Sequence, residues 1–277
     1  MRRVLIILAA AALAVCACQQ PKLVILHTNG THSHFEPVRG GQYDGLGGVT
    51  ERAAFVDSVR AVYGKDRVLL LHAGDFSQGT SYFSELEGRM EPMIIDDLGY
   101  DCVTLGNHEF DNGIEALTAR IKSVKSGTLF VCANLDLSPY ELGDVVKPYA
   151  ILERGGMKIG IIGLESDIST SVTKTIASRL QQLDNIEVTN KWADYLHEQE
   201  KCDMIILLSH AGYDQDQIIV PATRWVDLVV GGHTHTFVED LLYVDNARGK
   251  KVPIITDGCW GVEMGEILVN RKPSSAR

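Results

Sequence analysis

The sequence lacks several features that would each assign it to a class of protein. It has no excess of positive charge, since 26 Lys and Arg stand against 36 Asp and Glu, for a formal net charge of −10. That balance excludes a protein that binds polymeric nucleic acid through a basic surface. No internal repeat, low-complexity stretch or long linker interrupts its 277 residues. With 45% hydrophobic content, the chain can form one large or two small globular domains.

Beyond the N-terminal segment, the cysteines are Cys102, Cys132, Cys202 and Cys259. These four show no close-spaced ligand pattern such as C-x-x-C, which argues against a metal site built from them. The first two lie in or beside apolar runs, and the third precedes one. We expect buried free thiols. Because an exported protein can also hold disulfides, that alternative stays open.

The first residues carry the pattern of an export signal. Two arginines precede Val4–Val15, an unbroken apolar run of 12 residues. This run is shorter than the roughly 20 residues of a membrane span and fits the central part of a secretory signal. Cys18 follows the small residue Ala17, as in a bacterial lipoprotein signal. We expect residues 1–18 to be such a signal, with Cys18 lipidated and the protein exported to the periplasm or cell surface on a lipid anchor. An ordinary cleaved signal is the alternative.

Short apolar runs alternate with helix-like segments along the rest of the chain. The runs are nearly continuous and rich in Val, Ile and Leu, as in strands buried on both faces. They cover residues 22–26, 68–71, 102–105, 129–132, 159–164, 204–208 and 226–230, with later strands at 252–256 and 262–269. Residues 49–62, opened by Thr50, and 185–199 have helical spacing, and residues 149–164 form a hairpin pattern. The alternation predicts an α/β domain with a large mixed sheet system.

Side chains that can bind metals follow five of these runs where each run ends. One histidine at a strand end is usually a hydrogen-bonded boundary residue, but five such coincidences are hard to obtain by chance. Carboxyl ends of parallel strands gather at the edge where open α/β sheets bind ligands. We therefore expect one sheet edge to collect His32, Asp75, Asn107, His108, His210, His233 and His235.

Imidazole, carboxylate and amide oxygen form a mixed set of donors. This set suits Zn, Mn, Fe or Co better than Ca or Mg, which prefer oxygen alone. A single carboxylate such as Asp75 can bridge two ions about 4 Å apart, the spacing at which a metal pair promotes in-line displacement at phosphorus. The sequence therefore predicts a site for two divalent metal ions that activates water.

The order and spacing of these motifs resemble those of the calcineurin-like metallophosphoesterases. The resemblance is closer to the 5′-nucleotidase branch and covers residues 22–270, through LHTN, GDFSQGT, GNHEFD, SH and GGHTH. It implies an α-β-β-α sandwich of two mixed sheets flanked by helices, with residues 19–277 as a single domain. It also implies hydrolysis of phosphate monoesters, such as 5′-nucleotides, by metal-activated water.

The resemblance further implies a role for each motif residue. Asp75 would bridge the two metals. The remaining ligands would be His32 and His235 for the first metal, and Asn107, His210 and His233 for the second. His108 would be a catalytic histidine, not a ligand, that stabilises charge on the phosphoryl oxygen and the leaving group. Asp111 would orient it and favour its protonated form.

Gly30 departs from the family pattern, which has Asp two residues before the histidine that corresponds to His32. That Asp is a ligand of the first metal, so this chain loses one negative charge at the first site. Asn29 or His34 could partly replace it. We expect instead that the first site binds its metal more weakly and is only partly occupied, which impairs catalysis.

The chain ends at Arg277, without the C-terminal domain with which bacterial 5′-nucleotidases hold the nucleoside. Either a separate nucleotide-binding chain supplies that part, or the protein does not select nucleotides. Two functions remain: an exported phosphoesterase, or a catalytically weak metal-binding subunit that pairs with such a chain. A binding module that recognises sugars or nucleotides without metal would leave His210, His233 and His235 unexplained.

Overall fold

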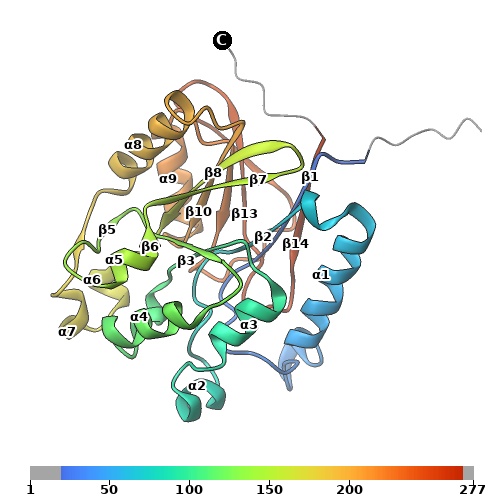
Figure 1. Ribbon diagram of the computed structural model, residues 1–277, viewed down its shortest axis with the longest axis vertical. Coiled ribbons are helices and arrows are strands. Elements are labelled where there is room, and N and C mark those ends of the chain that lie inside the picture. The colour runs from blue at the N-terminus through green and yellow to red at the C-terminus, as the bar shows by residue number, and fades with distance from the viewer. Residues whose placement is uncertain (1–19, 271–277) are drawn as a thin grey trace, which may run out of the picture.

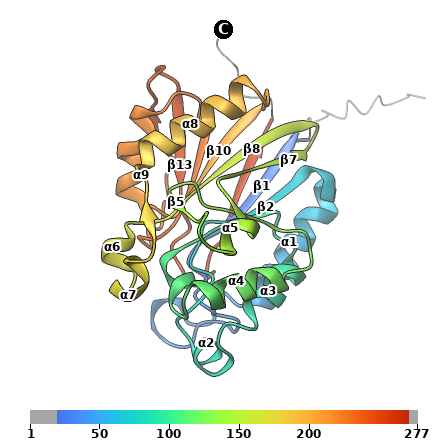
Figure 2. The ribbon, with the colours of Figure 1, turned by 60° about the vertical axis from the view of Figure 1, so that its left-hand side comes forward.

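Residues 20–270 of the computed structural model form two six-stranded sheets that stack face to face, with helices on both outer sides (Figures 1 and 2). The expected sandwich of two mixed sheets flanked by helices is confirmed. The predicted signal segment and Cys18 lie outside the described residues.

The first sheet has the strand order β14-β1-β2-β3-β4-β6. All neighbouring strands in it are parallel except β14, which pairs antiparallel with β1. The strands are β1 (Leu23–Thr28), β2 (Val68–His72), β3 (Cys102–Thr104), β4 (Leu129–Val131), β6 (Val146–Lys147) and β14 (Gly265–Val269). Every residue of β1, β2 and β3 is buried, which agrees with their continuous apolar sequences.

The second sheet has the order β12-β13-β11-β10-β8-β7, with antiparallel strands at both edges. Its strands are β7 (Tyr149–Arg154), β8 (Met157–Leu164), β10 (Met204–Ser209), β11 (Leu228–Gly231), β12 (Leu242–Asp245) and β13 (Lys251–Ile255). The β7–β8 hairpin is the one that the sequence predicts. A separate small ribbon joins β5 (Leu135–Asp136) to β9 (Gln181–Gln182).

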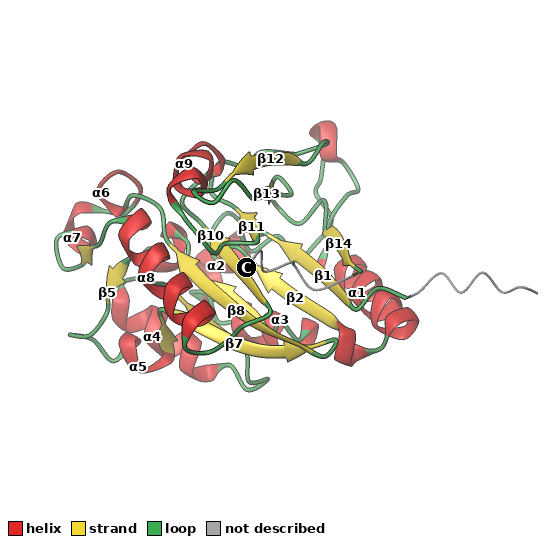
Figure 3. Ribbon diagram, turned by 90° about the horizontal axis from the view of Figure 1, so that it is seen from above, coloured by secondary structure: helices red, strands yellow, loops and turns green. Residues whose placement is uncertain are grey.

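Helices cover both outer faces of the sandwich. They are α1 (Val49–Tyr63), α2 (Ser81–Leu86), α3 (Glu91–Leu98), α4 (Ile114–Ser123), α5 (Leu142–Val145), α6 (Ile168–Ser171), α7 (Lys174–Ala177), α8 (Asn185–Glu198) and α9 (Tyr213–Ile219). Figure 3 shows the strands of both sheets between α8 on one side and α1 on the other. Within residues 20–270, no helix is both long and apolar enough to cross a membrane.

Three layers of buried side chains hold the sandwich together. One packs the first sheet against α1, α3 and α4, and another packs the second sheet against α8 and α9. The middle layer joins the inner faces of the two sheets, for example Ile25 and Leu71 of the first with Ile161 and Ile206 of the second. Because this layer is continuous, the two sheets are held in one fixed relation.

The two helices predicted from spacing are present, but they begin differently. Thr50 does not open α1: the preceding residue is Gly48, at φ 94° and without a side-chain cap. By contrast, the Asp184 carboxylate caps α8 by accepting a bond from the Glu187 amide at 2.9 Å. All four cysteines in the described chain are free thiols, and all are buried except the half-buried Cys202.

Candidate metal centre

The five motif loops meet at one place, but they come from two sheets. Those after β1, β2 and β3 belong to the first sheet, and those after β10 and β11 belong to the second. The expectation of a single sheet edge is therefore wrong. The loops converge because the apolar layer between the sheets brings the two sets of carboxyl ends together.

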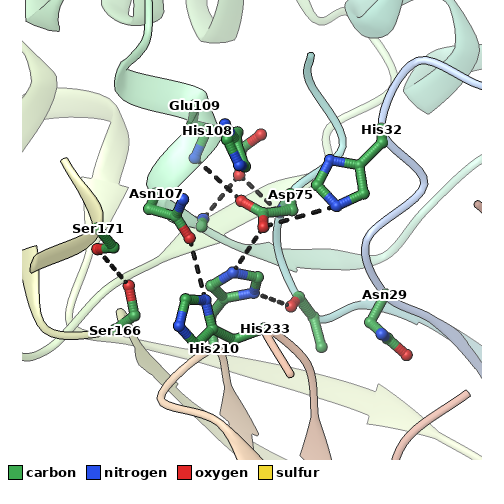
Figure 4. Close-up of polar contacts among 12 residues, drawn as sticks. Asn29, His32, Asp75, Asn107, His108, Glu109, Ser166, Ser171, His210 and His233 are labelled. Carbon is green, nitrogen blue, oxygen red and sulfur yellow. Dashed lines mark hydrogen bonds and ion pairs between the residues drawn. The ribbon is translucent and has the colours of Figure 1, made fainter. Parts of the chain in front are cut away.

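Asp75 lies at the centre of the converging side chains and is 2% exposed. Its Oδ2 lies 3.0 Å from His210 Nε2 and 3.8 Å from His32 Nε2. Its Oδ1 accepts a hydrogen bond from the His108 backbone amide at 3.0 Å. Figure 4 shows one carboxylate oxygen flanked by imidazoles from two different loops. This is the arrangement that a bridging carboxylate requires.

One cluster consists of Asp75, His210 and His233, which are residues expected to bind the second metal. Their ligand atoms lie within 4.8 Å of one another. The His210 Nδ1 donates to the Ala73 carbonyl at 2.7 Å, which leaves Nε2 facing the carboxylate. Asn107 Oδ1 lies 3.1 Å from His233 Nδ1 and so adds an amide oxygen to the same group.

His32 is the centre of the other cluster. Its Nε2 lies 2.8 Å from His235 Nε2, and the two rings meet edge to face. The ligand atoms of His32, Asp75 and His108 also lie within 4.8 Å of one another. The structure thus offers His108 as a third nitrogen on this side, whereas the family resemblance implies a catalytic role for it and not that of a ligand.

Four of the clustered residues have backbones in the left-handed region, which non-glycine residues seldom adopt: His32 at φ 49°, Asp75 at 57°, His233 at 73° and His235 at 52°. The glycines near these residues are required because atoms of the site lie too close to leave room for a Cβ. A Cβ on Gly106 would lie 2.4 Å from the Asp75 amide nitrogen, and one on Gly74 would lie 2.5 Å from His210 Nδ1. The left-handed backbone of the four residues is strained, and strain of this kind is typical of functional sites, where the position of the side chain matters more than the stability of the backbone.

Burial and the central carboxylate set the charges of the cluster. Burial lowers the pKa of His32 and of His233 to about 4 each, which keeps both rings in the neutral form that binds metal. Burial opposes charge on His210 too, but the adjacent Asp75 outweighs it and raises the pKa of His210 to about 10. Burial likewise disfavours charge on Asp75, yet His210 and His32 hold its pKa below the usual range.

The donor set fits a pair of transition-metal ions. It consists of buried imidazole nitrogens, one carboxylate and one amide oxygen. His210 Nε2 approaches Asp75 Oδ2 to 3.0 Å without the alignment of a hydrogen bond, and it has no other partner. A buried nitrogen in that position is satisfied when both groups bind a shared cation.

His108 projects toward the same space from the short helical turn Asn107–Phe110. Its Nδ1 lies 2.8 Å from Asp111 Oδ2, and its side chain is 33% exposed. The hydrogen bond that His108 Nδ1 donates to the Asp111 carboxylate raises the pKa of His108. The carboxylate therefore fixes the ring and leaves Nε2 free to contact a ligand.

Gly30 lies directly against the His32 cluster. A Cβ built on it would be 3.3 Å from both His32 Nε2 and His235 Nε2, so a side chain at this position would point at these ligands. Neither proposed substitute reaches that space. The Asn29 amide bonds to Asp257 and Gly258, and Figure 4 shows it pointing away from Asp75.

His34 is also occupied elsewhere. Its Nδ1 donates to the His32 carbonyl at 2.9 Å, and its ring stacks on Trp260 with centroids 5.0 Å apart. Asn29 and His34 are thus both engaged with groups other than the ligand atoms of the His32 cluster.

Glu109 is a positioning residue that the sequence argument did not single out. Its fully buried carboxylate accepts hydrogen bonds from the backbone amides of Asp75 at 2.8 Å, Ser77 at 3.0 Å and Gly106 at 2.6 Å. It thereby joins the loop that carries Asp75 to the loop that carries Asn107. The sequence feature that could have identified it is its place at the end of the GNHE motif, where an acidic residue directly follows two site residues.

Replacing Glu109 by Gln is expected to lower the free energy of unfolding by about 1–3 kcal/mol, because the amide nitrogen would face a buried N–H and leave it unpaired. Denaturant unfolding of the metal-free protein measures this. The matched control is Glu115→Gln, on the surface of α4, with an expected change below about 0.5 kcal/mol. Equal stability of the two variants would show that Glu109 does not hold the loops.

Comparisons with known proteins agree with this geometry. The pattern of the calcineurin-like phosphoesterases matches residues 23–237. The chain is 33% identical to a snake venom 5′-nucleotidase of Gloydius brevicauda, over 94% of this chain and 47% of that protein. It is similar in structure to a 5′-nucleotidase precursor of Thermus thermophilus, with a TM-score of 0.79 and 32% identity, over 88% of this chain and 50% of the other.

A further solved structure, the NAD nucleotidase of Haemophilus influenzae, gives a TM-score of 0.77 at 29% identity, over 88% of this chain and 46% of the other. The chain spans about half the length of these relatives. The shared region contains all five motif loops that surround Asp75. The chain belongs to the calcineurin-like phosphoesterase family.

Proposed function

We propose that this chain is a metal-dependent phosphoesterase that hydrolyses phosphate monoesters, with 5′-nucleotides as the preferred class. The observation that carries the proposal is Asp75 Oδ2 between His210 and His32, from loops of two different sheets. The similarity to 5′-nucleotidases supports the substrate class.

The residue roles follow from this geometry. His32, His235 and Asp75 would hold one divalent ion, and Asp75, Asn107, His210 and His233 the other, with Zn, Mn, Fe or Co as candidates. Such a pair supplies charge neutralisation at the phosphoryl group and water activated for attack. In the overall reaction, a water oxygen bonds to phosphorus, the P–O bond to the alcohol breaks, and the alcohol oxygen takes up a proton.

The His108 side chain would contribute to catalysis in addition to the metal ions. Asp111 accepts a hydrogen bond from His108 Nδ1, which would leave Nε2 to contact the phosphoryl oxygen and the leaving oxygen. A protonated ring in this place would stabilise charge on both oxygens and can supply the proton that the alcohol needs.

A second candidate function is favoured by one observation, the absence of any side chain at Gly30 where it faces His32 and His235. In this alternative, the chain is a catalytically weak metal-binding subunit that pairs with a separate nucleotide-binding chain. For either function we further propose that residues 19–277 form one domain and that Cys18 carries a lipid anchor after export.

Purified protein should hydrolyse AMP and p-nitrophenyl phosphate only with added metal, and the rate should rise as Mn²⁺ or Zn²⁺ is titrated in excess. The reason is that the first site lacks one anionic ligand and needs more metal to fill. Released phosphate measures the rate, with chelator-treated protein and Asp75→Asn as controls. No hydrolysis with any divalent metal at neutral pH would favour the weak-subunit alternative.

A further inference from the structure

A cavity of about 610 Å³ lies beside the His32 cluster, between residues 34–43, residues 80–82 and Trp260. Its volume is within the range of small-molecule sites. Five of its lining residues have rings that are partly exposed, so that faces or edges remain available: His34, Phe35, Tyr43, Tyr82 and Trp260. We refer to it as the aromatic cavity.

The walls of the aromatic cavity are bonded to the metal-binding segment. The Trp260 amide donates to the Gly30 carbonyl at 2.6 Å, and His34 Nδ1 donates to the His32 carbonyl at 2.9 Å. The Thr80 hydroxyl donates to the Ser33 carbonyl at 2.9 Å. Residues 30–34 therefore form the metal cluster on one side and the cavity wall on the other.

A buried arginine fixes the two stacked rings. Arg52, 3% exposed, donates to the His34 carbonyl at 3.2 Å and to the Trp260 carbonyl at 3.4 Å. The His34 and Trp260 rings lie 22° from parallel. Tyr43 meets Trp260 edge to face, at 6.1 Å between centroids. The rings are thus preorganised, which lowers the entropy cost of binding a flat ligand.

A second cavity, which is lined in part by His233, has different chemistry. It is of similar volume, but no Phe, Tyr or Trp lines it. Three carboxylates do: Asp167, Asp184 and Asp214. Their charge disfavours a phosphate ester, which is itself an anion, whereas the one carboxylate of the aromatic cavity, Glu36, is paired with Arg39 at 2.7 Å. Of the two cavities, only the aromatic one offers stacking surfaces to an organic group attached to the phosphate.

We infer that the aromatic cavity holds the nucleobase of a nucleotide whose phosphate lies at Asp75. This inference rests on the proposed function and deepens it, because it places base recognition inside this chain. Since every base has a flat π-face, stacking binds all of them with little discrimination. The cavity would therefore distinguish nucleotides from simple sugar phosphates, and only weakly one nucleotide from another.

The test compares AMP with ribose 5-phosphate, which has the same phosphate and sugar but no base. With added Mn²⁺, the wild-type ratio of kcat/KM for AMP to that for ribose 5-phosphate should be about 5 or more, because base stacking contributes about 1–3 kcal/mol. In Trp260→Leu the ratio should fall about 5- to 150-fold, the range for loss of one stacked ring. Trp260→Phe should keep most of the preference.

Two further variants keep the test decisive. Tyr82→Ala removes another ring of the cavity and should also lower the ratio, even if Trp260→Leu does not fold. Phe55→Leu, a ring on the outer surface of α1 that is 37% exposed, should leave the ratio unchanged. A wild-type ratio near 1, or a ratio that neither cavity variant lowers, would overturn the inference while the phosphoesterase function stands.

Binding of adenosine, which has no phosphate, tests the cavity without catalysis. Equilibrium dialysis should show that Trp260→Leu and Tyr82→Ala bind it more weakly than the wild type. If the protein hydrolyses no ester, the proposed function fails, and this measurement still applies to the cavity. Adenosine binding that is absent, or that the cavity variants leave unchanged, would overturn the inference.

Discussion

Replacing His108 by Asn is expected to slow hydrolysis about 10²- to 10⁴-fold, the range for loss of a general acid or base, with little change in metal content. The reason is that the loop does not depend on this side chain. Its position is set by the His108 backbone amide on Asp75 Oδ1 and by the Glu109 carboxylate on three other amides. Steady-state kinetics at saturating Mn²⁺, together with metal analysis, measures both quantities.

The matched controls are His210→Ala and His233→Ala, which should lose the second metal and therefore both metal content and activity. The comparison is needed because the ligand atoms of His32, Asp75 and His108 lie within 4.8 Å of one another. Equal loss of metal in all three variants would identify His108 as a ligand and show that its catalytic assignment is wrong.

Replacing Gly30 by Asp is expected to raise metal affinity at the first site by at least about 100-fold, since even outer-sphere partners change affinity by 10- to 100-fold. Activity at limiting metal should rise in parallel. The new Cβ would lie 3.3 Å from His32 Nε2 and His235 Nε2, so the carboxylate would enter the space that these nitrogens face. The backbone, at φ 49°, is in a region that Asp tolerates better than most residues.

Two substitutions separate charge from shape at this position. Asn is nearly the same size as Asp but carries no charge, so Gly30→Asn should raise the metal affinity of the first site much less than Gly30→Asp. Gly30→Ala reports the cost of a Cβ in this backbone conformation, about 1–2 kcal/mol.

Titration calorimetry of the wild type should show two unequal sites, with the Asn107, His210 and His233 site filled first. Two equal, tight sites would contradict the weak first site. Because Asn29 and His34 are bonded elsewhere, that result would point to an anion from solution in place of the missing carboxylate.

The sequence by itself was sufficient for the long buried strands and for the motif positions, but not for the short or exposed strands β5, β6, β9 and β12. Buried parallel strands need continuous apolar runs, and these are visible without a structure. Loops that approach each other closely need glycine, as beside Asp75 and His210. Both requirements act on neighbouring residues of the chain, so both can be recognised in short stretches of the sequence. The helix α1, by contrast, begins at Val49 as predicted, but it follows Gly48 without a side-chain cap, so the opening role expected of Thr50 was wrong.

The tertiary structure alone decided how the motif loops are brought together and which residues outside the motifs hold them in place. Nothing in the sequence assigns the β3 loop and the β10 loop to different sheets, because strand pairing is set by long-range packing across the central apolar layer. The same holds for Glu109, whose three partners lie on two loops, and for Arg52, which joins His34 to Trp260 across more than 200 positions. Hydrogen bonds between distant segments leave no periodic pattern, so the positioning of Asp75 and the aromatic cavity beside it emerge only when the chain is folded.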